Sequence, residues 1–178
     1  MTEAKLAPNL PGWMVEHANR YLSSGGTDGH MYKMTQPGRP EMTVPSLLLT
    51  TTGRKSGERF VFPLFYGKTG DSYIVVASKG GAPQHPGWYR NLMANPDVEV
   101  QVGTLKTKAR ARTATGEERT RLWEKALDSG RPTPTTSARP SARSRSLCWI
   151  LCTPEEKEPN DAAPANRRMP MRQDSLRD

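Results

Sequence analysis

The first regular pattern along the chain is helical. Between residues 11 and 24, apolar side chains recur at spacings of three and four positions, with Pro11 near the start and Gly25 and Gly26 after the end. This pattern predicts one amphipathic helix. Its apolar face can pack on the protein's own sheet, which is the favoured interpretation, or dock on a membrane surface. Residues 27–43 are rich in Gly, Pro and polar groups, so we expect a loop there.

Alternation with a period of two then replaces the helical pattern. Three apolar segments separated by turn compositions predict a β-meander, and two later segments around a Gly-Thr turn predict a further hairpin. The expected strands are 44–52, 60–68, 72–78, 98–102 and 106–115. Short strands joined in hairpins are typical of a small antiparallel barrel.

Two more helices are predicted around the later strands. Residues 83–95 form a short helix that Pro86 can start and an Asn-Pro pair ends. Another follows Thr115, which acts as its N-cap with Glu118 three positions on, the arrangement of a capping box. Because helices of this length can cover the openings of a barrel, we predict a mainly β (α+β) fold, a small antiparallel barrel flanked by short helices.

Charge narrows the choice of partner. The chain has 178 residues, a formal net charge of +8 and a pI near 9.8. Residues 131–178 contain nine Lys or Arg and six Asp or Glu, a net of +3, which leaves +5 for residues 1–130. The basic excess therefore belongs mostly to the part that folds. It favours an anionic partner, such as a phosphate, a carboxylate-rich cofactor, nucleic acid or an anionic membrane.

The cysteines and the absence of long apolar runs indicate a compartment. Cys148 and Cys152 both lie in the C-terminal segment, so the body of the protein has no disulfide and suits a reducing environment. No apolar run approaches the roughly 18 residues of a spanning helix, and the N-terminus lacks a signal-peptide core. We expect a cytoplasmic protein, with membrane association only through the N-terminal helix.

A glycine-rich basic loop follows the first apolar strand. In the segment "TTTGRKSGER", two glycines flank Arg54, Lys55 and Ser56, and Arg59 lies just beyond. Glycine lets backbone N–H groups approach an anion, while Arg and Lys supply charge and hydrogen-bond donors. The composition predicts a phosphate cradle, although the Walker spacing is absent. A solvated basic turn is the alternative.

A second loop has the same composition. Ser78 and Lys79 end a strand, two glycines follow, and a helix containing Trp88, Tyr89 and Arg90 comes next. Since both loops lie at the ends of strands that pair in one meander, they can face each other. Together they favour an anion site more than either does alone.

Other candidate sites are weaker. The three histidines are scattered without Cys or carboxylates at ligand spacing, so we expect no metal site. Neither a Gly-x-Ser-x-Gly elbow nor a Cys-His arrangement occurs. Residues 106–112 place Lys and Arg on one face of a strand, for which a solvated edge is favoured over RNA binding. We expect no nucleic-acid partner.

Three motifs resemble one known family. The runs "PSLLLTTTGRKSGERFVFPLFY", "YIVVASKGGAPQHPGWYRNLMANPDVEVQVG" and "ARTATGEERTRLWEKAL" are similar to the deazaflavin-dependent nitroreductase family, whose members use coenzyme F-420 on a split β-barrel. The resemblance covers roughly residues 12–127. It implies that residues 1–127 form a split-barrel, deazaflavin-binding domain. It also implies an oxidoreductase of the nitroreductase or quinone-reductase type, which reduces a quinone, enone or nitro compound with hydride from the reduced coenzyme.

The resemblance further implies the residues of the site. Ser78 is the implied catalytic hydroxyl, which with solvent can protonate the product. The implied coenzyme-binding residues are Arg54, Lys55, Ser56, Gly57, Arg59, Phe65, Ala77, Ser78, Lys79, Trp88, Tyr89, Arg90 and Asn91. The coenzyme carries a phosphodiester and carboxylates, which suits the basic domain, and FMN is less favoured. Many family members have Arg at the position of Phe60 and an aromatic hydroxyl at that of Phe65, whereas Arg59 and Tyr66 here lie one place away.

The sequence also allows a second function. In this alternative, the chain is a binding protein that holds the coenzyme or a lipid-like ligand without turnover. The protein is expected to be a monomer or a homodimer with a small-molecule substrate.

The C-terminal region departs from the family. Members continue with a Pro-Pro-Tyr-x-x-Tyr-Gln segment, whose tyrosines close over coenzyme and substrate, and with a final strand of the type Ile-Pro-Val-Val-Val-Leu. This chain shows neither, and residues 130–153 are rich in Arg, Ser and Pro instead.

A shifted reading frame accounts for this departure. In this frame, each codon consists of the third base of one observed codon and the first two bases of the next. Read in this way, residues 128–151 can encode Phe-Trp-Pro-Pro-Tyr-Ala-Asp-Tyr-Gln and, further on, Ile-Pro-Val-Val-Val-Leu. We therefore predict that residues 128–178 are an out-of-frame, disordered tail, which leaves the barrel without its last strand and the site without its tyrosines. The apolar run 147–151 can fill part of the open edge instead. A genuine Arg/Ser/Pro-rich tail, also disordered by composition, is the alternative.

Overall fold

The computed structural model describes residues 3–35, 37–38, 40–77, 84–128 and 149–154. The helices are α1 (Gly12–Ser23), α2 (Gly87–Ala94) and α3 (Gly116–Asp128). The strands are β1 (Lys5–Leu6), β2 (Met31–Met34), β3 (Met42–Thr52), β4 (Arg59–Thr69), β5 (Ser72–Val76), β6 (Asp97–Val102), β7 (Leu105–Thr113) and β8 (Trp149–Pro154).

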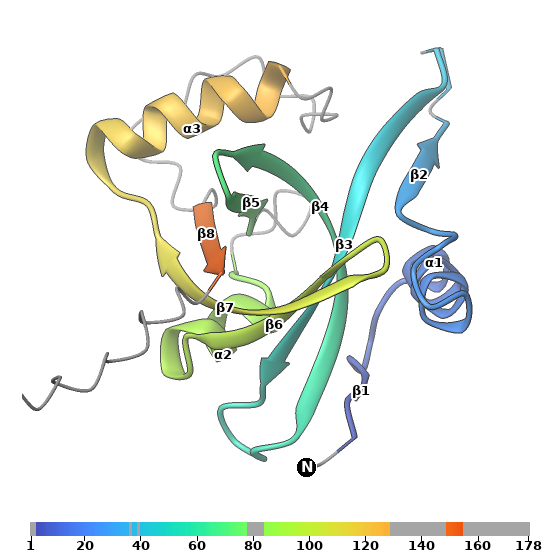
Figure 1. Cartoon of the computed structure of the whole chain (residues 1–178), viewed down its shortest axis with the longest axis horizontal. Coiled ribbons are helices and arrows are strands. Elements are labelled where there is room, and N and C mark those ends of the chain that lie inside the picture. Colours follow the sequence, from blue (N-terminus) through green and yellow to red (C-terminus); the bar gives the residue numbers. More distant parts are fainter. Residues whose placement is uncertain (1–2, 36, 39, 78–83, 129–148, 155–178) are drawn as a thin grey trace, which may run out of the picture.

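Six of these strands close into a barrel. Their order is β3, β4, β5, β8, β7 and β6, and β6 pairs again with β3 (Figure 1). All pairs around the ring are antiparallel. The predicted meander of β3, β4 and β5 and the predicted β6–β7 hairpin are confirmed, as is the mainly β fold class with short flanking helices.

The strand that completes the ring comes from the segment predicted to be a disordered tail. β8 pairs with β5 on one side and with β7 on the other, so Ile74 lies opposite Leu151 and Ala111 opposite Cys152. The expectation of an open barrel edge is therefore wrong, whereas the alternative that the apolar run 147–151 fills the edge agrees with β8, which overlaps this run. An apolar run that can pair its backbone N–H and C=O groups on both sides is well suited to fill an open edge. Residues 129–148 and 155–178 lie outside the described part.

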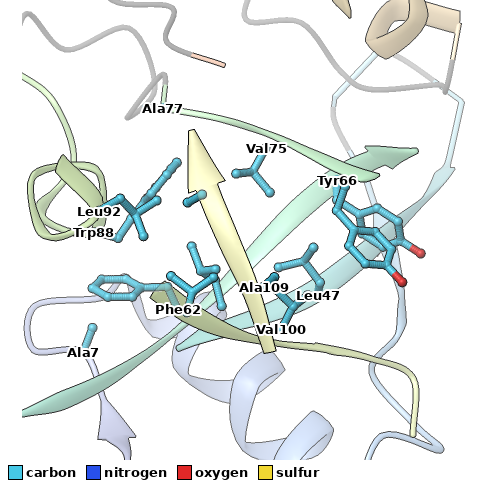
Figure 2. Close-up of a cluster of buried hydrophobic side chains, with 14 residues drawn as sticks. Ala7, Leu47, Phe62, Tyr66, Val75, Ala77, Trp88, Leu92, Val100 and Ala109 are labelled. Carbon is cyan, nitrogen blue, oxygen red and sulfur yellow. The ribbon is translucent and has the colours of Figure 1, made fainter. Parts of the chain in front are cut away.

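The barrel interior is the main core. Inward-facing side chains of β3, β4, β6 and β7 meet there, and Trp88 and Leu92 of α2 join the same cluster (Figure 2). Strand β3 is buried on both faces, which explains its unbroken run of leucines. Leu47 and Leu49 belong to the interior, whereas Leu48 faces outward.

Helix α1 covers the outer face of β3 and β4. Ala18 and Tyr21 cluster with Leu48 and Val61, so the favoured interpretation, packing on the protein's own sheet, is confirmed (Figure 1). The hydroxyl of Tyr21 accepts the N–H of Gly103 at 2.7 Å, which ties the helix to the β6–β7 turn.

Two strands lie where no strand was expected. β2 falls inside the predicted loop 27–43 and pairs antiparallel with the start of β3. β1 runs parallel to β4, with Lys5 opposite Phe60. Both are too short to show a period-two pattern, and their partners are distant in sequence.

Candidate functional site

The loop between β3 and β4 is a tight, glycine-dependent turn. The N–H of Gly53 donates to the carbonyl of Glu58 at 2.7 Å, and the N–H of Gly57 donates to the carbonyl of Gly53 at 2.8 Å. Gly57 has a φ of +70°, which favours glycine. A Cβ on Gly53 would lie 2.7 Å from the ring of Phe60. This turn leaves the residues between the glycines, 54–56, exposed to solvent.

A buried amide on α2 fixes the first residue of that loop. The Oδ1 atom of Asn91 accepts the backbone N–H of Arg54 at 3.3 Å and its Nη1 at 3.2 Å. The Nδ2 atom of Asn91 donates to Oγ1 of Thr51 at 3.1 Å. Asn91 is only 6% exposed and Thr51 only 1%. The end of β3, the loop and α2 are therefore joined through one side chain.

Two acidic residues partly neutralise the cations around the loop. Arg59 forms an ion pair with Glu99 of β6. Lys5 of β1 contacts Oε1 of Glu58 at 2.5 Å and lies 5.4 Å from the centre of the Phe60 ring. The hydrogen bond from Lys5 lowers the pKa of Glu58. Within the described residues no salt bridge involves Arg54 or Lys55, so the positive charge at the loop tip is not neutralised by these carboxylates.

The predicted site residues on α2 divide into buried and exposed groups. Trp88 is 5% exposed and shares the barrel core with Ala77, so its ring packs against protein (Figure 2). Tyr89 is half-buried and its ring lies beside that of His85, with ring centres 4.6 Å apart and the ring planes tilted by 40°. Arg90 is exposed. Of the predicted residues on this helix, Tyr89 and Arg90 therefore reach the surface, whereas Trp88 and Asn91 are buried.

The other predicted residues lie elsewhere or outside the described part. Ser78 and Lys79, the implied catalytic hydroxyl and the second cation, fall within residues 78–83, which the structure does not describe. Phe65 lies near Trp13 and Tyr32, with ring centres 6.1 and 5.5 Å away. It therefore lies beside α1 and β2, and the contacts of the described residues do not join it to the basic loop.

The neighbour of Phe65 faces the opposite way. Tyr66 is buried in the barrel core, and its hydroxyl lies 3.0 Å from Nε2 of His30. Burial raises the pKa of Tyr66, with a further contribution from Tyr73. The phenol is therefore neutral at physiological pH and part of the interior.

A cleft of about 270 Å³ opens between α2 and β7. Its lining residues are Leu92, Met93, Pro96, Ala111, Arg112 and Thr113. None of the predicted site residues belongs to this set.

Two of the four cations on the basic face of β7 form ion pairs. Arg110 bonds Asp97 at 3.1 Å, and Arg112 forms two hydrogen bonds with Glu118 at 2.8 and 2.6 Å. The interpretation of this face as a sheet edge is wrong, because β7 lies between β6 and β8. Solvation and local ion pairing account for these cations.

The sequence alone did not indicate that Thr51 and Glu58 contribute to the site. Thr51 is 40 positions from Asn91, and Glu58 is 53 positions from Lys5. Such pairs become visible only when the strands are aligned. The glycine-flanked basic composition of residues 53–57, by contrast, correctly indicated an exposed loop.

Comparison with known proteins identifies the family. The model of the "F420H(2)-dependent quinone reductase" family matches residues 13–147. An F420H(2)-dependent quinone reductase of Mycobacterium tuberculosis is 43% identical over 110 residues, which cover 61% of this chain and 68% of that protein.

Solved structures agree with the family match. An F420-H2 dependent reductase is 36% identical, with a TM-score of 0.51 over 61% of this chain and 93% of that one. A domain-swapped dimer is 34% identical, with a TM-score of 0.52 over 79% and 96%. Among the described residues, every helix is too short or too polar to cross a membrane. The chain belongs to the F420H(2)-dependent quinone reductase family, and it is therefore an oxidoreductase that uses the reduced coenzyme F-420.

Proposed function

We propose that this chain transfers hydride from reduced F-420 to a small electron-poor substrate, with quinones first and enones or nitro compounds as related acceptors. The observation that carries the proposal is the exposed basic loop 53–58, whose backbone is fixed by two glycines and by Asn91. Its donors suit a phosphodiester and carboxylates, the anionic groups of the coenzyme. Family membership supports the choice of donor.

Each part of the chain has a role in this proposal. Arg54, Lys55 and Ser56 bind the anionic part of the coenzyme, while Tyr89 and Arg90 border its ring system. The bound coenzyme supplies a hydride, which is two electrons and one hydrogen nucleus. The substrate then needs one proton, which comes from solvent or from the hydroxyl of Ser78. As is usual for cofactor enzymes, the protein orients the reactants and supplies electrostatics.

The competing function is binding without turnover. Within the family the tyrosines after α3 close over coenzyme and substrate, and the encoded chain lacks that segment. A protein that retained the anion loop but lost these tyrosines could still bind the coenzyme. The two functions predict the same affinity and different chemistry.

Oxidation of reduced coenzyme in the presence of menadione separates them. Loss of the reduced-coenzyme absorbance above the rate without enzyme supports the reductase. Coenzyme binding at micromolar concentration with no oxidation above background would establish the binding protein instead. Parallel assays with a cyclic enone and a nitroaromatic compound test the substrate class, since a quinone reductase should turn over menadione fastest.

We also propose a cytoplasmic protein without a nucleic-acid partner, as a monomer or homodimer. The large apolar side chains of α1 that remain exposed are Trp13 (43%) and Leu22 (41%). They are the residues through which the helix would contact a membrane surface. Co-sedimentation with anionic vesicles tests that contact.

A further inference from the structure

We propose that Asn91 is a positioning residue that orders Arg54 for recognition of a phosphodiester, and that it does not itself bind the coenzyme. The inference rests on the proposed function, because it assigns the loop to the coenzyme's anionic part. Asn91 is 6% exposed, which leaves its amide little access to a ligand. Its oxygen already accepts two hydrogen bonds from Arg54, and its NH₂ group already donates to Thr51.

The hydrogen bonds fix the orientation of the amide. The backbone N–H and the guanidinium of Arg54 are donors only, so the atom that faces them must be the amide oxygen. The NH₂ group then faces Thr51, whose hydroxyl oxygen accepts at 3.1 Å. A flipped amide would place donors against donors on the Arg54 side. Only one rotamer therefore satisfies this network.

This arrangement restricts both the backbone and the side chain of Arg54. A free arginine on a surface loop samples many rotamers, and binding an anion would cost that conformational freedom. Here one oxygen accepts from the backbone at the base of the residue and from the guanidinium at its tip. Arg54 is exposed, so the N–H groups of its guanidinium that do not face Asn91 can bind phosphate oxygens, in a bidentate manner, from an ordered position.

The same amide connects the loop to the rest of the site. Its neighbours in α2 are Trp88 and Leu92, which are buried in the barrel core, and Arg90, which is exposed. Because the barrel core holds α2 in place, the hydrogen bonds of Asn91 hold Arg54 in a fixed position relative to this helix. The distance between the phosphate-binding loop and the exposed face of α2 is thereby set by one hydrogen-bonded side chain.

A purely structural role for Asn91 makes a different prediction. Loss of a buried amide that only satisfied neighbouring polar groups would weaken the fold and every ligand to the same degree. A positioning role through Arg54 should affect only ligands that have a phosphate. The test therefore compares intact F-420 with the shortened deazaflavin that ends at the ribityl chain and lacks the phosphodiester and glutamates.

The variants are Asn91→Leu, Asn91→Asp and Arg54→Gln. Leucine keeps the volume and removes the acceptor, so we expect the Kd for intact F-420 to rise about 10-fold. The Kd for the shortened deazaflavin should change by less than about twofold, since that ligand has no group for Arg54. Aspartate retains an acceptor for Arg54 and can accept from the hydroxyl of Thr51, so it should keep Arg54 in place. Because it also adds a negative charge beside the anion, it should restore the affinity in part, to a value above that of R54Q.

The double variant N91L/R54Q completes a double-mutant cycle for the affinity of intact F-420. If Asn91 acts through Arg54, then N91L should add little to the loss already caused by R54Q. Equal weakening of both ligands by N91L, or additive losses in the double variant, would overturn the proposal. If N91L does not fold, the test compares the affinities of N91D and R54Q for intact F-420. An N91D affinity as low as that of R54Q would also refute the positioning role of Asn91. Absence of F-420 binding by the unmodified chain would instead refute the proposed function.

Discussion

Lys55 is the cation at the tip of the basic loop. Its side chain is exposed, and no salt bridge involves it within the described residues. We expect Lys55→Ala to lower the affinity for F-420 by about 1–3 kcal/mol, the value of a charge-assisted hydrogen bond. The loss should shrink at high salt, because screening weakens an exposed interaction. Titration of the coenzyme at two ionic strengths measures both effects.

The control for this variant is another exposed lysine. Lys106 lies on the β6–β7 hairpin opposite Gln101, away from the basic loop in the chain and in the ladder. Lys106→Ala changes the net charge equally and should leave the affinity nearly unchanged. Equal losses in the two variants would indicate a general charge effect and contradict the placement of the anion at the loop.

His17 is a buried titratable group outside the proposed site. Its Nε2 lies 2.7 Å from Oγ of Ser46, whose hydroxyl donates to the carbonyl of Gly29 at 3.1 Å. That hydroxyl proton is committed, so Nε2 carries a proton and donates it to Oγ of Ser46. Nδ1 is buried without a hydrogen-bond partner among the described residues. Burial, followed by the nearby charge of Arg20, lowers the pKa of His17.

The lowered pKa predicts a loss of stability in mild acid. The unfolded chain takes up a proton near its ordinary pKa of 6.5, whereas the folded chain resists protonation. The contribution of His17 is therefore fully present above pH 6.5 and declines as the pH falls below that value. We expect the melting temperature to drop between pH 7.5 and 5.5, with a shallower drop in His17→Gln. An identical slope in the variant would show that other groups cause the acid sensitivity.

At the level of elements, the end of α1 meets the β6–β7 turn at a close backbone contact. Gly26 has a φ of +101°, and a Cβ there would lie 1.9 Å from the carbonyl oxygen of Gly103. Gly25 also has a positive φ, of +64°, but a Cβ there would meet nothing within 4 Å. Both glycines therefore have a positive φ, but only Gly26 would also meet a backbone clash.

That difference gives a matched pair of variants. Gly25→Ala should cost about 1 kcal/mol, the penalty for a left-handed non-glycine residue. Gly26→Ala should cost about 1–3 kcal/mol more, because α1 must shift away from the turn. Urea unfolding of both variants measures the difference. Equal free energies of unfolding would mean that the helix end adjusts freely and that this contact does not fix α1.

The elements that the sequence predicted well are those with a strong local pattern. Strands β3 to β7 and the three helices follow from periodicity and turn residues, with boundaries shifted by a few positions. β1 and β2 were missed because their pairing depends on partners far away in the chain. β8 was indicated only by the apolar run 147–151, since its two partner strands are also distant in sequence. Trp88 shows the same limit in the site. An aromatic residue after a glycine-rich loop can line a ligand or fill a core, and the burial of Trp88 in the core depends on barrel closure, which the local sequence does not show.

At the scale of the whole molecule, the ring of strands depends on β8. It pairs with both β5 and β7, so without it each of these strands would present unpaired N–H and C=O groups. In the shifted reading frame, residues 143–149, which end where β8 begins, would encode the final strand that is typical of the family. The coding DNA tests the shifted frame directly. Third bases at Pro132, Pro134, Thr135 and Thr136 that do not encode the tyrosine segment would exclude it.

Three forms of the protein separate closure of the barrel from the role of the tyrosines. They are the present chain, a chain truncated after Asp128, and a chain whose frame is repaired near Asp128. Truncation removes β8, so the melting temperature should fall and aggregation should increase. The repaired chain replaces β8 with a Val- and Ile-rich strand of higher β-propensity and restores the tyrosines, so stability and kcat/KM with menadione should both rise.

The pattern across the three forms decides between explanations. A truncated chain as stable as the present one would show that β8 does not stabilise the barrel. A repaired chain that is more stable and no more active would show that the tyrosines are dispensable, which would leave proton delivery to solvent or to Ser78. A rise in kcat/KM in the repaired chain, with the coenzyme Kd unchanged, would assign the tyrosines to the chemical step. The basic loop 53–58, which precedes the altered segment, would then account for the coenzyme affinity of both the present and the repaired chain.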